Sequence, residues 1–191
     1  IILPVVIAIM ILLAGILYFI SKDIIKEYSE NLLTSSIDNQ TNQIEAWLNE
    51  NLSAFGAVKQ AIEQTKPDER QLQAILDSYY GFHDNYPEGL YIADANGKLM
   101  TASASEKKET DPTQSVWYKE GLTRWNMGLT NAYTNAGGSK VISASGILDD
   151  QSGIMKVISA DLTLERISII VNSYIEMDGA RAFLVSSTDG K

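Results

Sequence analysis

The sequence contains no cysteine and only one histidine, His83, among its 191 residues. The absence of cysteine excludes disulfides, thiolate metal sites and cysteine nucleophiles, and one histidine cannot form the zinc sites that are common in proteins. Serine and aspartate are plentiful, but no activated arrangement of nucleophile and base is visible. We therefore expect no catalytic residue, no metal site and no cofactor, and we expect His83 to be a structural residue of its polar loop.

Charge is absent from residues 1–20, IILPVVIAIMILLAGILYFI. As a helix, such a run is roughly 30 Å long, which matches the hydrocarbon core of a bilayer. The apolar region of a signal peptide is shorter, roughly 7 to 15 residues, and a small-residue cleavage site follows it. Here Tyr18 and Phe19 end the run and Lys22 and Lys26 follow, which is typical of a membrane interface. We predict a transmembrane helix, with a signal peptide or a buried core helix as the alternatives.

Positive charge is scarce, because 15 Lys and Arg residues stand against 24 Asp and Glu residues, for a net charge of -9. Such an acidic chain is not expected to bind nucleic acid. All of the charges follow residue 20, so they belong to a soluble part of the chain. We expect a protein of the cell membrane.

Glycine and proline are almost missing from residues 21–65, where Gly56 is the single exception. Apolar residues recur there at spacings of three, four and seven, the pattern of one face of a continuous helix. Polar residues 38–43 interrupt this face, so a strict coiled coil is not expected. The pattern fits a helix packed along a domain and equally a dimerising stalk that transmits movement. The two combine if the first half pairs in a homodimer and the second half packs along the domain. The apolar residues of this face are Ile37, Ile44, Leu48, Leu52, Phe55, Val58 and Ile62.

A Lys-Pro-Asp sequence at residues 66–68 ends the stalk helix, because proline disfavours helical geometry in the residue before it. A second amphipathic helix is predicted to follow and to end near Gly81. Two short apolar runs then flank Asn96-Gly97, which is the signal of a β-hairpin. The fold class is therefore α+β with an antiparallel sheet. The remaining elements are predicted as a helix at 116–126, strands at 129–134, 140–147 and 153–162, and a helix at 164–175.

An internal repeat relates residues 90–98, LYIADANGK, to residues 183–191, FLVSSTDGK, at a constant offset of 93. Both segments combine an apolar strand with a tight turn, which favours two homologous modules over chance convergence of hairpins. The domains expected from these patterns are a transmembrane helix at 1–20, a stalk helix at 21–65, a first module at 66–163, a linking helix at 164–178 and the start of a truncated second module at 179–191.

Three segments carry a resemblance to a known family: VWYKEGL at 116–122, Ala132-Tyr133, and SKVISASGILDDQSGIMKVISADLTLERI at 139–167. With the order of helices and strands, they resemble the membrane-distal module of the double Cache (dCache) sensory domains of bacterial transmembrane receptors. The resemblance implies a PAS-like sheet module that binds a small molecule for a methyl-accepting chemotaxis receptor, with the residues after about 21 extracytoplasmic. Cytoplasmic signalling partners would be reached through a further part of the protein. The same sensor region of a histidine kinase or a diguanylate cyclase is the alternative.

In that family a Trp-Tyr pair, a later Tyr and an Asp at the end of the last strand line one pocket. On physical grounds, Asp161 in an apolar strand must find a cationic or hydrogen-bonding partner. A ligand amine is one candidate, and Lys156, Arg166 or the start of the following helix are structural alternatives. The aromatic residues have apolar faces and polar edges that suit a pocket, or they belong to the core. The ligand-binding residues that the resemblance implies are Trp117, Tyr118, Tyr133 and Asp161, together with Ser115 and Asn135.

The chain departs from the amino-acid-binding members of that family at three positions. Where those members have an Arg, an Asp and a Tyr, this chain has Ser115, Asn135 and Thr110. The missing Arg removes the bidentate partner of a ligand carboxylate, and a serine hydroxyl cannot replace its charge. Arg124 is nearby in sequence and is a candidate to compensate. The resemblance therefore implies an amine or a neutral polar metabolite as ligand, and a purely structural stalk is the remaining interpretation.

Overall fold

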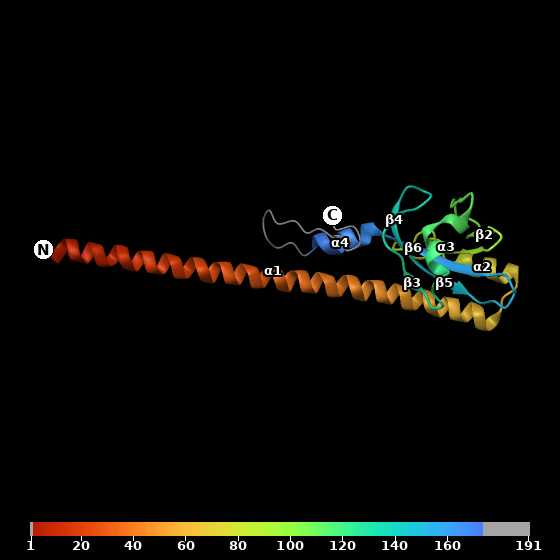
Figure 1. Ribbon diagram of the computed structural model, residues 1–191, viewed down its shortest axis with the longest axis horizontal. Helices are drawn as coiled ribbons and strands as arrows, with labels where there is room; N and C mark the ends of the chain where they lie inside the picture. The colour runs from red at the N-terminus through yellow and green to blue at the C-terminus, as the bar shows by residue number, and fades with distance from the viewer. Residues whose placement is uncertain (1, 174–191) are drawn as a thin grey trace.

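The computed structural model describes residues 2–173, so the repeat at 183–191, the start of a second module and the end of the linking helix lie outside the described residues. Helix α1, Ile2–Thr65, runs along the whole molecule, and the sheet is gathered at its C-terminal end (Figure 1). Its 64 residues correspond to a length of about 95 Å at ~1.5 Å per residue. Helix α4, Leu164–Ser173, leaves the sheet and lies back along α1.

The second half of α1 forms the floor of the sheet domain, whereas its first half is exposed. Trp47, Phe55 and Ile62 are buried in the main core, and their spacing places them on one face of the helix. Ile37 belongs to the apolar face predicted from the sequence, but half of its surface is exposed in the described structure. Packing against the sheet therefore begins after Ile37.

Helix α2, Glu69–Tyr79, starts with a capping box. The Asp68 carboxylate accepts a hydrogen bond from the Gln71 N–H at 2.8 Å, and the Asp68 N–H donates to the Gln71 side chain at 3.0 Å. Between the two helices, Lys66 has a φ of 47° that allows the chain to reverse. The side chains that fix α2 to the core are Leu72 and Leu76.

Within residues 2–173, six strands form one antiparallel sheet in the order β2-β1-β6-β5-β3, and β4 also pairs with β5. The hairpins β1–β2 and β5–β6 are joined side by side through the pairing of β1 with β6. The sheet and its helices confirm the α+β class predicted from the sequence. The strands are β1 (Leu90–Asp94), β2 (Leu99–Met100), β3 (Gly128–Leu129), β4 (Tyr133–Thr134), β5 (Lys140–Leu148) and β6 (Lys156–Thr163).

The short helix before β3 is shorter than predicted. A helix was expected over residues 116–126, but α3 spans only Val116–Gly121. The carbonyl oxygen of Arg124 accepts a hydrogen bond from the Ile147 N–H of β5 at 2.9 Å. This bond draws the chain towards the sheet edge, so the helical pattern cannot continue.

Two strand predictions also need correction. The single strand expected over 129–134 is divided into β3 and β4. The Thr130 N–H donates to the Ser143 carbonyl oxygen at 2.8 Å, but the Ser143 N–H donates to the Thr130 hydroxyl at 2.9 Å instead of to a backbone carbonyl, so the regular ladder ends there. The strand expected over 153–162 begins later, at the first residue of β6. Gly153 has a φ of 76° and belongs to the preceding turn.

The pleat gives the sheet two faces of different chemistry, because successive side chains point to opposite sides. One face packs on α1 and α2, and its buried residues are Leu90, Ile92, Ala144, Leu148, Ile158, Ala160 and Leu162. Helix α3 and the loop at 101–115 cover the other face. This second face is aromatic and polar, and its buried residues are Tyr91, Ala93, Val141, Ser143, Ser145, Val157, Ser159 and Asp161.

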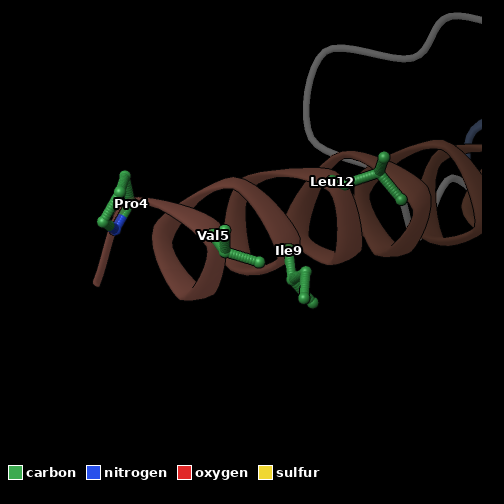
Figure 2. Close-up of a pocket in the computed structure, with 4 residues that line it drawn as sticks. All are labelled: Pro4, Val5, Ile9 and Leu12. Carbon is green, nitrogen blue, oxygen red and sulfur yellow. The ribbon is translucent and has the colours of Figure 1, made fainter. Parts of the chain in front are cut away.

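Among the described helices, α1 is the one long and apolar enough to cross a membrane, and none of its apolar window is buried. A hollow near its start is lined by Pro4, Val5, Ile9 and Leu12, whose side chains stand along the outside of the helix (Figure 2). All four side chains are apolar. The hollow is therefore uncovered helix surface and offers no polar group to a ligand.

Gly121→Ala should destabilise the domain, because α3 lies very close to the sheet at this residue. A Cβ atom there would lie 2.4 Å from Val157 Cγ1 and 3.2 Å from Ser145 Cβ. Overpacking of this kind costs about 1–3 kcal/mol, so the melting temperature of the detergent-solubilised chain should fall by several degrees. Gly56→Ala is the control, since a Cβ atom at that residue would meet nothing within 4 Å and alanine favours a helix. Equal melting temperatures for the two variants would contradict the close packing of α3.

Candidate ligand-binding site

Asp161 is the centre of a buried polar cluster on the second face of the sheet. Only 4% of its surface is exposed, although it carries a carboxylate. Its Oδ1 accepts hydrogen bonds from the Tyr91 hydroxyl and from Ser143 Oγ, the latter at 2.6 Å. Its Oδ2 accepts from Lys107 Nζ at 2.8 Å and from Asn135 Nδ2 at 3.1 Å. The carboxylate thus has the partners that burial of a charge requires.

The cationic partner of Asp161 is Lys107, which the sequence did not single out. The Lys107 side chain is 7% exposed, and its Nζ also lies 3.5 Å from Glu109 Oε1 and 4.0 Å from the centroid of the Tyr91 ring. Lys156, one of the structural alternatives, pairs with Asp150 instead. The Arg166 side chain, a second alternative, lies outside the described residues. The third alternative was a cap for the following helix, but the four hydrogen bonds to the Asp161 carboxylate come from side chains elsewhere in the domain.

Glu109 holds the position next to the Trp-Tyr pair. Its side chain is 5% exposed and accepts hydrogen bonds from Ser115 Oγ at 2.6 Å and from Trp117 Nε1 at 3.2 and 3.3 Å. Arg124 does not take this place, because it pairs with Glu120 at 2.8 Å. The end of the site where the resemblance implied a carboxylate-binding arginine is therefore occupied by a carboxylate of the protein itself.

Aromatic rings pack beside the two carboxylates, since Tyr91 bonds Asp161 and Trp117 bonds Glu109. Trp117 is completely buried and meets the Tyr91 ring edge to face at 4.8 Å and the Tyr118 ring at 5.7 Å. The Tyr133 hydroxyl lies 2.7 Å from Ser143 Oγ, which bonds Asp161 in turn. The structure thus brings four of the other predicted residues to Asp161 or Glu109, directly or through one partner: Ser115, Trp117, Tyr133 and Asn135. Tyr118 contributes ring packing beside Trp117.

A cavity of about 410 Å³ adjoins the cluster. This volume is in the range of small-molecule sites in proteins, roughly 300–1,000 Å³. Asp161, Asn135 and Lys107 stand on its wall, with Glu88 and Lys108 among the charged residues around them. Among residues 2–173, no group of three or more His, Asp or Glu side chains is placed to hold a metal. The cavity is suited to a small polar organic molecule.

The electrostatics of the cluster favour an ionised Asp161. Burial alone would raise the pKa of Asp161, but the positive charge of Lys107 and the hydrogen bonds from Lys107 and Ser143 outweigh burial and lower that pKa below its ordinary value. Burial, and then the charge of Asp161, raise the pKa of Tyr91 and of Tyr133 well above the ordinary value. Both phenols stay neutral at physiological pH and keep their protons for donation.

The helical stalk, the single antiparallel sheet and the buried polar cluster on its outer face define an α+β sensor-type domain. The chain matches the model of the methyl-accepting chemotaxis protein-like family, first PDC sensor domain, over residues 29–169. It therefore belongs to this family, which is a family of sensor domains and not of enzymes. The chemoreceptor resemblance predicted from the sequence is confirmed.

Individual relatives agree with this assignment. The methyl-accepting chemotaxis protein PscA of Pseudomonas syringae pv. tomato is 27% identical over 154 residues, which are 79% of this chain and 24% of PscA. The ligand-binding domain of the Campylobacter jejuni chemoreceptor Tlp3, solved with L-valine, has a TM-score of 0.62 at 22% identity and covers 76% of this chain and 65% of its own. The ligand-binding domain of the Pseudomonas aeruginosa PAO1 amino acid chemoreceptor PctC, solved with GABA, has a TM-score of 0.66 at 23% identity. This match covers 76% of this chain and 68% of the PctC chain. This chain thus spans about a quarter of the length of PscA, and the structural matches confirm the fold.

Asp161→Asn should destabilise the domain in a pH-dependent way. Because the folded pKa of Asp161 lies below its unfolded value, its contribution is fully present above the ordinary carboxyl pKa of ~4 and is lost as the pH falls through the lowered pKa. Loss of one partner of a buried ion pair costs about 3–5 kcal/mol, so the melting temperature near pH 7 should fall strongly. The difference from the wild type should shrink below about pH 4.

The matched control for this pH series is Asp84→Asn, which removes the same charge from an exposed loop residue. It should leave the melting temperature nearly unchanged at every pH. If Asp161→Asn were equally destabilising at pH 7 and at pH 3, the ionised carboxylate would not be the source of the stability.

Proposed function

We propose that this chain is the ligand-sensing part of a transmembrane chemoreceptor, and that it binds a small polar, amine-containing metabolite beside Asp161. The observation that carries the proposal is a buried carboxylate with four side-chain donors on the wall of a 410 Å³ cavity. A carboxylate in this position attracts an ammonium group and hydrogen-bonds it. Of the residues proposed for the ligand site, Asn135 and Asp161 line this cavity. The other four are not on its wall and surround Glu109 and Asp161: Ser115, Trp117, Tyr118 and Tyr133.

The ligands of the structural neighbours agree with one part of this proposal. Tlp3 was solved with L-valine and PctC with GABA, and both compounds carry an ammonium group and a carboxylate. The ammonium group fits Asp161 in this chain. A ligand carboxylate directed towards Ser115 and Trp117 would meet Glu109, and like charges at close range repel. The amine is therefore the feature that we carry over to this chain.

Signalling is proposed to run through α1. The turn between β5 and β6 is fastened to this helix, because Glu63 accepts a hydrogen bond from the Asp149 N–H at 2.9 Å and pairs with Lys59 at 2.7 Å. A ligand that binds two arrangements of the sheet domain with different affinity shifts the balance between them, and α1 carries the shift towards the membrane. Residues after about 21 are extracytoplasmic in this proposal, and residues 66–163 form the membrane-distal module.

A homodimer through the first half of α1 is also proposed. Ile25, Tyr28 and Leu32 follow one another at helical spacing, and each is exposed in the single chain. Pairing with the same stripe of a second copy would cover these apolar side chains. Cytoplasmic signalling partners would then respond to the relative position of the two helices.

A screen by thermal shift is expected to identify the ligand class. Amines should raise the melting temperature of the detergent-solubilised chain, whereas purines and organic acids without an amine should not. Asp161→Ala should abolish the stabilisation, because the ammonium group loses its counter-ion, and Asp84→Ala should retain it. A compound that stabilises wild type and Asp161→Ala equally would place binding elsewhere, and the absence of any response to amines would favour a structural stalk.

Cysteine crosslinking tests the stalk. The sequence has no cysteine, so each introduced cysteine is unique. In membranes, Ile25→Cys, Tyr28→Cys and Leu32→Cys should form disulfide-linked dimers at rates that change when ligand is added. Phe55→Cys should not crosslink, because this side chain is buried against its own sheet domain. Uniform crosslinking along the helix, or rates independent of ligand, would contradict the proposal.

A further inference from the structure

The loop segment 106–109, Glu-Lys-Lys-Glu, alternates between solvent and the interior. Glu106 and Lys108 are exposed, whereas the side chains of Lys107 and Glu109 are 7% and 5% exposed. An extended segment presents alternate side chains to opposite sides, so one local conformation accounts for both inward charges. The loop therefore delivers one ammonium and one carboxylate to the buried face of the sheet.

The surroundings of Lys107 Nζ are those of a bound primary ammonium ion. It lies 2.8 Å from Asp161 Oδ2, 3.5 Å from Glu109 Oε1 and 4.0 Å from the centroid of the Tyr91 ring. Two carboxylates and an aromatic face are the groups that bind alkylammonium ligands in proteins. A lysine side chain is itself an alkylammonium ion attached to the backbone. Lys107 therefore occupies an ammonium-binding subsite from within the chain.

Charge further limits what can replace Lys107. With the lysine in place, the two carboxylates and the ammonium sum to one negative charge, and withdrawal of Lys107 leaves two. A cation restores the balance that Lys107 provided. A ligand that also carries a carboxylate brings a further negative charge to Glu109, which already holds Ser115 Oγ and Trp117 Nε1.

The following inference rests on the proposed function. We propose that the Lys107 ammonium group competes with the ligand for one subsite, and that the ligand is a primary alkylammonium compound without a carboxylate. It takes the subsite formed by Asp161, Glu109 and the Tyr91 ring, and Lys107 withdraws into the adjoining cavity, whose wall it already forms. The covering loop is held to the sheet by Lys107 in one state and released from it in the other. The ligand thereby distinguishes two states of the domain, as a signal requires.

The first experiment measures affinity by calorimetry on the full chain in detergent, with n-butylammonium and 4-aminobutyrate as probes. The two compounds have the same carbon chain length and differ in the carboxylate. Wild type should bind n-butylammonium more tightly than 4-aminobutyrate. Glu109→Gln should reduce the ratio of the two affinities, because it removes the charge that repels the carboxylate of 4-aminobutyrate. Equal or tighter binding of 4-aminobutyrate to wild type would overturn the proposed ligand class without any need for a folded variant.

The second experiment removes the competitor. Lys107→Ala leaves two buried carboxylates, so its melting temperature should fall, and n-butylammonium should restore it while n-butanol should not. The affinity of this variant for n-butylammonium should exceed that of wild type by roughly tenfold or more, because no internal cation competes. Lys107→Met also removes the competing charge, so this variant should likewise bind n-butylammonium more tightly than wild type. Lys108→Ala, at the exposed neighbour, should behave like wild type.

These outcomes separate the inference from the function on which it rests. If a compound from the screen depends on Asp161 but binds Lys107→Ala and wild type with equal affinity, the binding site stands and the competitor role of Lys107 is wrong. Rescue of Lys107→Ala by n-butanol as well as by n-butylammonium would also overturn that role. If no compound depends on Asp161, the proposed function is wrong, and the inference fails with it.

Discussion

The pairing of β1 with β6 is the interaction on which the rest of the sheet domain depends. It joins two hairpins through residues as distant in sequence as Leu90 and Ala160, which are partners in the ladder. A shift of this register by one residue would exchange the two faces of the strand. In the observed register, Tyr91 and Asp161 share the face opposite α1, and the apolar residues beside them point to the core. The buried carboxylate and its phenol partner meet through this register alone.

The Asp161 carboxylate links the stability of the sheet domain to the loop at 101–115, because it bonds both Ser143 of the sheet and Lys107 of the loop. Ser143 stands directly opposite Asp161 in the β5–β6 ladder and donates to it, so part of the cluster is fixed by the sheet. Lys107 belongs to a loop without regular structure, and its position depends on the ion pair. The buried charge of Asp161 is thus neutralised by a loop lysine that, in the proposal above, the ligand displaces. A fully apolar interior would contain no ion pair through which a ligand could change the position of the loop.

The helices and hairpins could be predicted because their signals are local. Asn96-Gly97 indicated the β1–β2 turn, and the acidic residue Asp161 in a largely apolar strand indicated a buried charge that needs a partner. The identity of that partner could not be predicted, because Lys107 lies in a charged tetrapeptide of the kind that normally faces solvent. Glu109 was missed for the same reason, although the loss of an arginine at Ser115 hinted that the charge at this end had changed.

In the proposed signalling route, the length of α1 turns small movements of the sheet domain into larger movements at the membrane end of the helix. Between Trp47, where the helix is buried, and Ile20, at the end of the apolar run, 27 residues of unbroken helix span about 40 Å. A tilt of about two degrees about Trp47 displaces a rigid rod of this length by roughly 1.4 Å at Ile20. In the proposed signalling route the helix acts as a lever arm, and a small change of packing beside the pocket moves the membrane end by more than an ångström.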